Sequence, residues 1–464
     1  MEYRAGKVTQ VSTTLAELKG AYRLLENDDV LHESLIDAAG CACVRRSAGY
    51  PFVFVPVDGT SATLVDPIGV LGAVGPNRAG ARGIKVISAI ALSPTGEPIG
   101  LCGQEHWARP TQTRGKPRRV RGKQQAKAKQ HARAKRLQVQ KARSCAKRPT
   151  NQKETQHWID VIHATKRRFE EGAPTTKCWF QLDREADAWP ILQKLAQDRV
   201  DDWFTVRGVN RNVSLGERST AHLRSVLKAQ EAIGGYELEV PAAKGRTAHR
   251  AHLEIRVAEV VLDLRDKLTH KHHPLKLRAV LTREVGTTPE GEEPLDWLLM
   301  TNHAVDTLEE AQLVIEGYAQ RWKIERVHKT WKSGGCHIED SQLHTPQAVM
   351  KWATILFSVA IRVERINHLA RTSPELPASV ELSSCEIRAL LLLKRKYKKR
   401  TETIPDTMPT IAQAGRWIAD LGGYTGKSSG GPFGSITLGR GLSKVVVVAA
   451  AMESLDETSR GSSG

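Results

Sequence analysis

Three acidic residues are the strongest candidates for chemistry in this sequence. Asp58 and Asp183 each end an apolar run that is typical of a buried strand. In open α/β sheets, ligands gather where strands end, although a helix cap or loop is the commoner role for any single aspartate. Glu325 lies in a predicted long helix. Separated carboxylates of this kind suit a site for hard divalent cations such as Mg²⁺.

The helix around Glu325 carries a second set of reactive side chains. Tyr318, Arg321, Glu325 and Lys332 are spaced at offsets of 0, 3, 7 and 14, and at about 100° per residue they fall within roughly 60° of one another. An apolar stripe lies on a different side of the helix and consists of Leu313, Ile324, Val327 and Trp331. Periodicity alone favours an ordinary amphipathic surface helix over a functional one.

Hydrolysis of a phosphodiester would use this set of residues. Two metal ions about 3.5–4 Å apart activate the attacking oxygen and stabilise the leaving oxygen. Asp58, Asp183 and Glu325 would hold two Mg²⁺ ions, for which Mn²⁺ can substitute. Arg321 and Lys332 would then bind DNA phosphates, the first as a fork and the second as a point charge. Tyr318 would donate a hydrogen bond to the same backbone.

Three motifs give a specific resemblance. The segment from Tyr318 to Gly335, YAQRWKIERVHKTWKSGG, resembles the Tyr-Arg-Glu-Lys signature of DDE transposases in the insertion-sequence-four family. DREAD at 183–187 resembles the second-aspartate motif of that family, and DGTS at 58–61 resembles the first. Similar patches are GAYR at 20–23, EHWARP at 105–110 and PLDWLL at 294–299. The resemblance covers most of the chain, and its motifs occur in the family's order.

The resemblance implies an α/β fold. We expect a ribonuclease-H-like catalytic core with a mixed sheet, interrupted by a β-strand-rich insertion, plus helical N- and C-terminal regions. It implies nicking of an element end, hairpin formation by the freed 3′-hydroxyl, and strand transfer into target DNA. It also implies that the tryptophan at the position of Trp297 stacks in a flipped-base pocket, whereas a core tryptophan is an equally good interpretation.

Further DNA contacts are less specific. His328 and Lys329 match family positions near DNA, but a plain helix surface explains them nearly as well. Arg207 and Arg211 follow a predicted strand and could bind phosphates near Asp183, or be solvated loop residues. The His270–His273 cluster has no cysteine nearby in sequence, and an exposed turn is a better interpretation than a metal site.

Charge and composition point to a nucleic acid partner. The net charge is +18, and fifteen Lys and Arg residues lie between Thr111 and Arg148 without one Asp or Glu. Such a segment favours a polyanion, and its few apolar residues argue against a membrane surface. No run of eighteen apolar residues occurs, so we expect no membrane span. Seven scattered cysteines and no signal peptide predict a cytoplasmic, nucleoid-associated protein.

Apolar patterning and the resemblance divide the chain. The expected parts are a helical N-terminal region (1–50, a shortened DNA-end-binding part), the first part of the core (51–208) with a basic insertion inside it (111–152), a β insertion domain (209–300), the glutamate helix with the second part of the core (301–370), and a C-terminal region with a possible dimerisation role (371–464). Predicted core strands cover 52–58, 84–92, 98–104, 177–182 and 203–206. The predicted glutamate helix covers 308–332.

Two departures from the family leave alternatives open. The family usually has several tens of helical residues ahead of the part that matches Met1, and they help to recognise element ends. The basic segment at 111–148 stands where a shorter, acidic segment is usual. We expect a homodimer on paired double-stranded DNA ends, namely the element's terminal inverted repeats, together with target DNA. The alternatives are a catalytically silent DNA-binding regulator and a stand-alone nuclease of the same fold.

Overall fold

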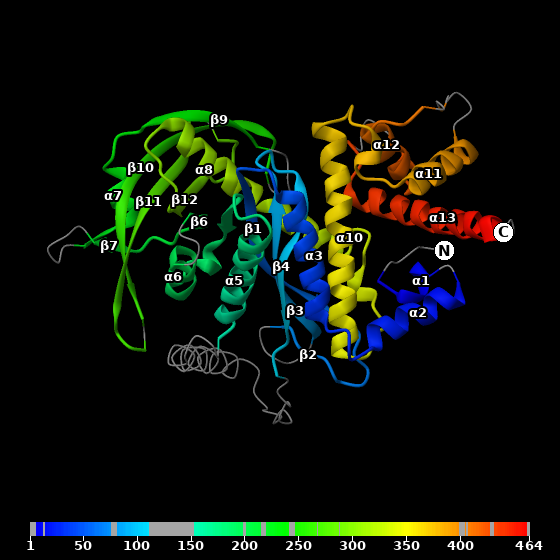
Figure 1. Cartoon of the computed structure of the whole chain (residues 1–464). Helices are drawn as coiled ribbons and strands as arrows, with labels where there is room; N and C mark the ends of the chain where they lie inside the picture. The colour runs from blue at the N-terminus through cyan, green and yellow to red at the C-terminus, as the bar shows by residue number, and fades with distance from the viewer. Residues whose placement is uncertain are drawn as a thin grey trace, which may run out of the picture.

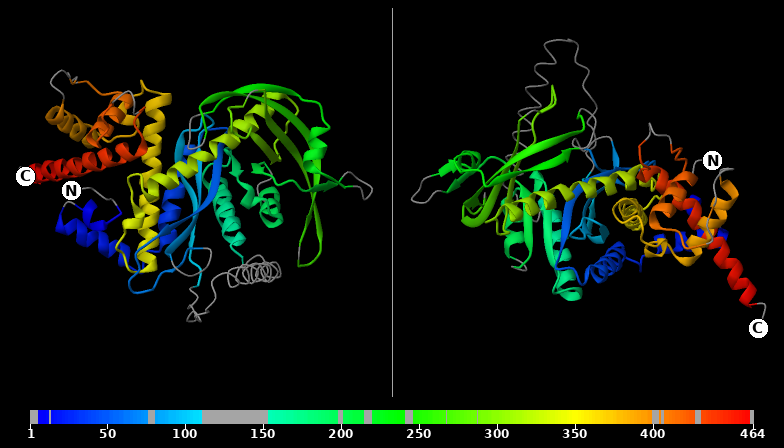
Figure 2. Two further views of the ribbon diagram at one scale, coloured as in Figure 1. Left: turned by 180° about the vertical axis from the view of Figure 1, so that it is seen from behind. Right: turned by 90° about the horizontal axis from the view of Figure 1, so that it is seen from above.

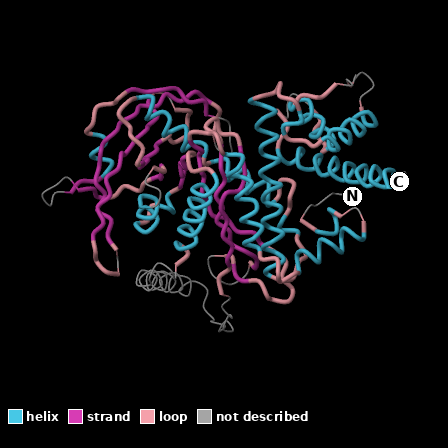
Figure 3. Tube along the Cα trace, in the orientation of Figure 1, coloured by secondary structure: helices cyan, strands magenta, loops and turns pink. Residues whose placement is uncertain are grey.

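The structure is a computed structural model of the chain, with a mixed sheet at its centre and a helical region at one side (Figures 1 and 3). It describes residues 6–12, 14–75, 81–110, 153–197, 201–214, 220–240, 246–266, 268–286, 288–398, 404, 407–426 and 431–461. The basic segment 111–148, and the predicted insertion 111–152 that contains it, lie outside the described residues. The predicted mixed α/β class with helical ends is confirmed.

Five strands form the part of the sheet that carries the acidic residues, in the order β4-β3-β1-β5-β6, with a short strand β2 beside β3. β1 pairs antiparallel with β3 and parallel with β5, and β5 pairs parallel with β6. Their bounds are β1 Phe52–Thr63, β2 Gly72–Ala73, β3 Arg82–Leu92, β4 Pro98–Trp107, β5 Lys177–Leu182 and β6 Trp203–Arg207. All five predicted core strands are present, and this mixed order is consistent with the ribonuclease-H-like core that the sequence predicts.

The β-rich segment extends the same sheet instead of forming a separate one. β12 pairs antiparallel with β6, and β11, β10 and the shorter strands follow outward. Pairing with β12 covers what would otherwise be the open edge of β6. The elements are β7 Asn212–Ser214, β8 Thr220–His222, α7 Leu223–Lys228, β9 Gly234–Val240, β10 His249–Arg265, β11 His272–Val285 and β12 Asp296–Thr301.

Helices cover both faces of the sheet. α5 (Thr155–Gly172) and α6 (Trp189–Gln197) pack on one face, while α8 (Leu308–Gln320), α9 (Trp322–Lys332) and α10 (Pro346–Thr372) pack on the other. Side chains alternate along β1, so Val57 enters the first core and Phe54 the second. Asp58, four residues after Phe54, therefore faces α8 and α9.

The predicted helix 308–332 is divided at Arg321 into α8 and α9, although Figure 2 shows the two following nearly one line. The dihedrals of Arg321 remain helical, but its amide bonds the Tyr318 carbonyl at 3.0 Å, a tighter i−3 contact. The prediction of one uninterrupted helix is wrong at this residue. Thr307 caps the start of α8 in a capping box with Glu310, as its sequence indicates.

A second helical group lies at the side of the sheet and has its own core, to which α10 contributes (Figure 1). It consists of α10 together with α11 Ser384–Tyr397, α12 Ile411–Leu421 and α13 Ser435–Gly461. At the other end of the chain lie α1 Val8–Val11, α2 Leu15–Glu26 and α3 His32–Ser47, and the short 3-10 helices are η2 Arg184–Ala186, η3 Ile338–Asp340 and η4 Ala378–Val380. Lys351 of α10 ties α2 to this frame, because its ammonium donates to the Leu25 and Asn27 carbonyls at 3.0 and 2.7 Å.

α13 differs from the expectation that no segment is apolar enough to cross a membrane. Within the described residues, its part Ser435–Asp456 has the length and mean hydropathy, 1.4, of a possible span. The same helix packs against α10, α11 and α12. Length and hydropathy alone do not separate a membrane helix from one that docks on protein.

Candidate active site

The parallel register between β1 and β5 brings the two aspartates together. Val57 pairs with Leu182 at the end of the shared ladder, so Asp58 and Asp183 take neighbouring positions on strands about 4.8 Å apart. The sequence predicts Asp58 as the last residue of its strand, but β1 continues beyond it because its outer half goes on pairing with β3. Asp183 does follow its strand, and its Oδ1 accepts a 2.8 Å hydrogen bond from the Glu185 amide.

Glu325 approaches the same place from the helical layer. α9 packs on β1, and the guanidinium of Arg321 joins the two elements. Its Nη1 lies 3.3 Å from Asp58 Oδ2, and its Nη2 lies 2.7 Å from Glu325 Oε1. The Arg321 side chain is 6% exposed, against 16% for Asp58 and 36% for Glu325, so solvent reaches the group mainly at Glu325.

The carboxylates of Asp183 and Glu325 affect the ionisation of Asp58. Burial is the largest cause that raises the pKa of Asp58, which reaches about 7; the Arg321 guanidinium lowers it, while the charges of Asp183 and then Glu325 raise it. One guanidinium thus fails to compensate for burial together with two neighbouring carboxylates.

A divalent ion suits this donor set once the guanidinium is moved. In the part of the chain that the structure describes, no three His, Cys, Asp or Glu side chains are grouped closely enough to hold one ion, and Arg321 lies between Asp58 and Glu325. The residues present still offer only carboxylate oxygens, which Mg²⁺ and Mn²⁺ prefer. Burial, and then the charges of Asp183 and Glu325, raise the pKa of Asp58, and a divalent cation would favour the ionised carboxylate.

Tyr318 lies next to Arg321, and Trp297 packs against Tyr318. Tyr318 is 1% exposed, and its ring lies 5.9 Å from Arg321 Cζ and, edge-to-face, 5.7 Å from the ring of Trp297. Burial raises the pKa of the Tyr318 phenol, whereas the charges of Arg321 and Arg207 lower it. The phenol packs against the guanidinium in this structure, and the hydrogen bond from Tyr318 to the DNA backbone stays a prediction. Trp297 is half-buried and packs on the same core.

The other predicted contacts on α9 differ in exposure. Lys329 is exposed and Lys332 half-buried; burial lowers the pKa of Lys332, and Glu339 opposes this. His328 is only 6% exposed, and burial lowers its pKa to about 3. Its ring packs edge-on at 5.8 Å from that of Phe357. The expected DNA contact at His328 therefore does not fit the structure: the residue extends the apolar face of the helix.

Arg207, at the end of β6, and Arg211, four residues later, have different surroundings. Arg211 forms an ion pair with Asp187, and its Nη2 donates to the Asp187 carbonyl at 3.1 Å. Asp187 in turn accepts a 2.8 Å hydrogen bond from the Val209 amide, so Arg211 is paired within this loop, and its contact with a phosphate stays a prediction. Arg207, at the end of β6, is half-buried, and its charge reaches Tyr318 at the site.

The His270–His273 cluster lies at the β10–β11 hairpin. The imidazole Nδ1 of His272 lies 2.8 Å from Asp263, and His273 stacks on Trp189 with ring centroids 5.0 Å apart. No metal-binding group of three residues includes this cluster among the described residues. The interpretation as an exposed turn thus agrees with the structure.

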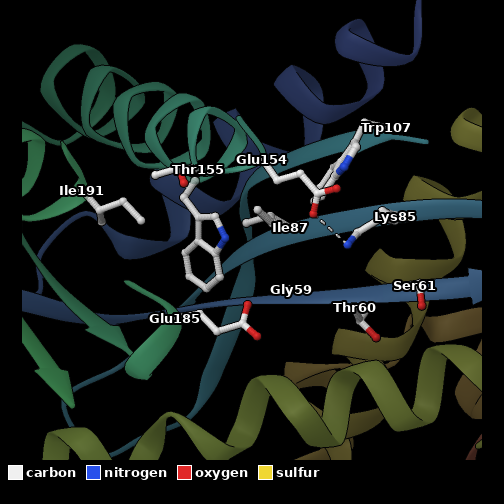
Figure 4. A pocket seen from close by; sticks show the side chains of 11 residues that line it. Gly59, Thr60, Ser61, Lys85, Ile87, Trp107, Glu154, Thr155, Glu185 and Ile191 are labelled. Carbon is white, nitrogen blue, oxygen red and sulfur yellow. Dashed lines mark hydrogen bonds and ion pairs between the residues drawn. The ribbon is translucent and has the colours of Figure 1, made fainter. Parts of the chain in front are cut away.

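Sequence reasoning missed a polar pocket of about 390 Å³ lined by Gly59 of β1, on the α5 face of the sheet and opposite the face to which Asp58 points (Figure 4). Its walls include Thr60, Glu185 and an ion pair of 3.1 Å between Lys85 Nζ and Glu154 Oε2. Arg109, from the EHWARP patch, donates to the same Glu154 oxygen at 2.6 Å. That patch was the only sequence signal for this cluster, since Glu154 lies far along the chain.

The sheet, the acidic group and the cationic side chains beside it define the class of a metal-dependent enzyme acting on phosphodiesters. Comparison with protein families gives two matches: the transposase DDE domain over residues 96–361 and the transposase Tn5 dimerisation domain over residues 358–459. The first covers more than half of the chain, including Asp183 and Glu325. The chain therefore belongs to the DDE transposases, and the second match makes it a Tn5-like member of the insertion-sequence-four family. The predicted recognition is confirmed.

The Tn5 dimerisation match begins within α10 and includes α11, α12 and α13. This match suggests self-association through the C-terminal region, as the sequence predicts.

Proposed function

We propose that the chain catalyses cut-and-paste transposition, with Asp58, Asp183 and Glu325 as its catalytic carboxylates. The observation that carries this proposal is the convergence of the three acids: Asp58 and Asp183 take neighbouring positions on paired strands, and Arg321 joins Asp58 to Glu325. Burial, and then the charges of Asp183 and Glu325, raise the pKa of Asp58 to about 7. Structural aspartates of a sheet gain nothing from such crowding, whereas a site for divalent cations requires it.

The proposed role of each site residue follows from its position in the fold. Asp58 and Asp183 would hold one side of a two-ion Mg²⁺ centre from rigid strands, and Glu325 would close it from α9. When bound, the ions would supply an activated oxygen nucleophile and stabilise the leaving 3′-oxygen. Arg321 and Lys332, with Lys329 farther out on the exposed side, would fix the DNA phosphates so that the scissile bond faces the carboxylates.

The same site would carry the later steps. The freed 3′-hydroxyl would be held against the opposite strand to give a hairpin, and after reopening it would attack target DNA. Trp297 is half-buried beside Tyr318. A partly open indole close to the acidic group supports its assignment as the stacking partner of a flipped base, because stacking offsets part of the cost of unstacking.

A direct test is to incubate the protein with Mg²⁺ and DNA that carries the element's own ends. Nicked DNA, hairpinned element ends and released flanking DNA are expected, and E325Q and D183N should abolish these products while leaving DNA binding intact. Binding without cleavage by the unaltered protein would refute the enzyme and favour the regulator. Nicking without hairpins would favour the stand-alone nuclease.

The basic segment at 111–148 has a separate proposed role, the binding of target or flanking DNA through phosphate neutralisation. Its fifteen cationic residues and lack of acids support this. Affinity should fall steeply with salt. Deletion of residues 111–148 should flatten that dependence, and an unchanged salt slope would refute the role.

A further inference from the structure

Arg321 occupies the position in which a shared cation would be expected. It is the residue that joins Asp58 to Glu325, at 3.3 and 2.7 Å. Its side chain is 6% exposed, and the aromatic rings of Tyr318 and Trp322 lie 5.9 and 5.2 Å from Cζ. The guanidinium is therefore held between carboxylates on one side and aromatic rings on others.

This placement is incomplete as a structural ion pair. The Nε of Arg321 is buried and makes no hydrogen bond to any described residue, and an unsatisfied buried donor costs stability. The guanidinium brings one positive charge to the two carboxylates that it contacts, Asp58 and Glu325. Both features favour an arginine that can leave its partners when a better cation and a better anion arrive.

We propose that Arg321 is a cationic latch: it bridges Asp58 and Glu325 in the metal-free protein and must release them before a divalent ion can bind. The released fork then pairs with a DNA phosphate. DNA, by drawing the guanidinium away, raises the affinity for the ion, and the ion raises the affinity for DNA by the same factor. The protein without DNA is thereby kept from assembling its metal centre. This inference rests on the proposed function, since it takes the three acids as metal ligands.

The latch can be tested by Mn²⁺ titration followed by electron paramagnetic resonance, which reports free ion and needs no turnover. R321Q without DNA should bind Mn²⁺ at least about fivefold more tightly than the unaltered protein, the low end of ordinary coupling between sites. R321K keeps the charge but cannot bridge two carboxylates as a fork, so an intermediate gain is expected. R326Q is the matched control, because Arg326 pairs with Glu364 at 2.8 Å instead of with the acidic group.

A short duplex at saturating concentration completes the test. It should tighten Mn²⁺ binding to the unaltered protein and to R326Q, but much less to R321Q, in which no latch remains to be withdrawn. Equal Mn²⁺ affinities in R321Q, R326Q and the unaltered protein would overturn the latch. A different failure, Mn²⁺ binding that is unchanged in E325Q, would overturn the proposed metal site itself. Circular dichroism melts show whether each variant is folded, and R321K supplies the test if R321Q is not.

Discussion

Replacement of Asp58 by asparagine should stabilise the metal-free protein at alkaline pH although it removes a proposed ligand. The folded-state pKa of Asp58 is raised from 3.8 to about 7. Asp58 therefore contributes most to stability below 3.8, and this contribution is lost as the pH rises to about 7. Asparagine keeps the shape of the side chain and its acceptor for Arg321, but it carries no charge to repel Asp183 and Glu325.

The size of the effect follows from the pKa. A rise from 3.8 to about 7 corresponds to about 4 kcal/mol between the two protonation states. Part of that cost is already present at mildly acidic pH, so the advantage of D58N should grow by about 2–3 kcal/mol between pH 5 and pH 8. Relaxation of the site would reduce this figure without changing its sign.

The assay is urea unfolding in the presence of a chelator, followed by tryptophan fluorescence at both pH values. D160N is the matched control, because Asp160 is an exposed carboxylate on α5, and its difference from the unaltered protein should stay flat. If the D58N difference were the same at pH 5 and pH 8, or reversed in sign, Asp58 would not be buried beside two other carboxylates as described, and this account of the site would be refuted.

Three further outcomes are expected. K351M should lower the free energy of unfolding by about 1.5–3 kcal/mol, because it leaves the Leu25 and Asn27 carbonyls without their charged donor. Hydrogen exchange in α2 should become faster, and unchanged exchange there would contradict this prediction. V446E places a charge on a side chain of α13 that is 41% exposed; it should weaken self-association by about tenfold or more in sedimentation, whereas V446T should not. W331A should lower the free energy of unfolding by about 3–5 kcal/mol, because Trp331 is fully buried and donates to the Ala353 carbonyl at 3.0 Å. Denaturant unfolding measures this loss. A loss below about 1 kcal/mol would contradict the prediction and show that the neighbouring side chains fill the cavity without strain.

Local elements were largely predictable from the sequence, but the pairing that builds the site was not. Apolar runs identify β1 and β5 because both strands are buried on both faces. Nothing local specifies that Val57 pairs with Leu182, a contact between segments far apart in the chain. That register makes neighbours of Asp58 and Asp183, and only the family resemblance anticipated the result.

Helix periodicity was informative but was interpreted too narrowly. His328 lies four residues after Ile324 and three before Trp331, both fully buried, so the spacing itself places it on the core face. An apolar stripe drawn widely enough to include position 328 would have predicted His328 as a buried residue. The binding partner of Arg321 is harder to predict, because a guanidinium on the polar face of a helix fits a phosphate or a carboxylate equally well. Which of the two it contacts depends on how α9 lies over β1.

The site joins a rigid half to an adjustable one, and this division explains how the arginine can move. Asp58 lies within the hydrogen-bonded strand β1, and Asp183 directly follows the paired strand β5. Glu325 and Arg321 instead depend on α9, which is anchored through the buried Trp331 but separated from α8 at Arg321 itself. A change at the helix junction can therefore shift the guanidinium and the third carboxylate without disturbing the sheet. Regulation by DNA is physically plausible only in such an arrangement, since a site built wholly on strands would have no element to rearrange.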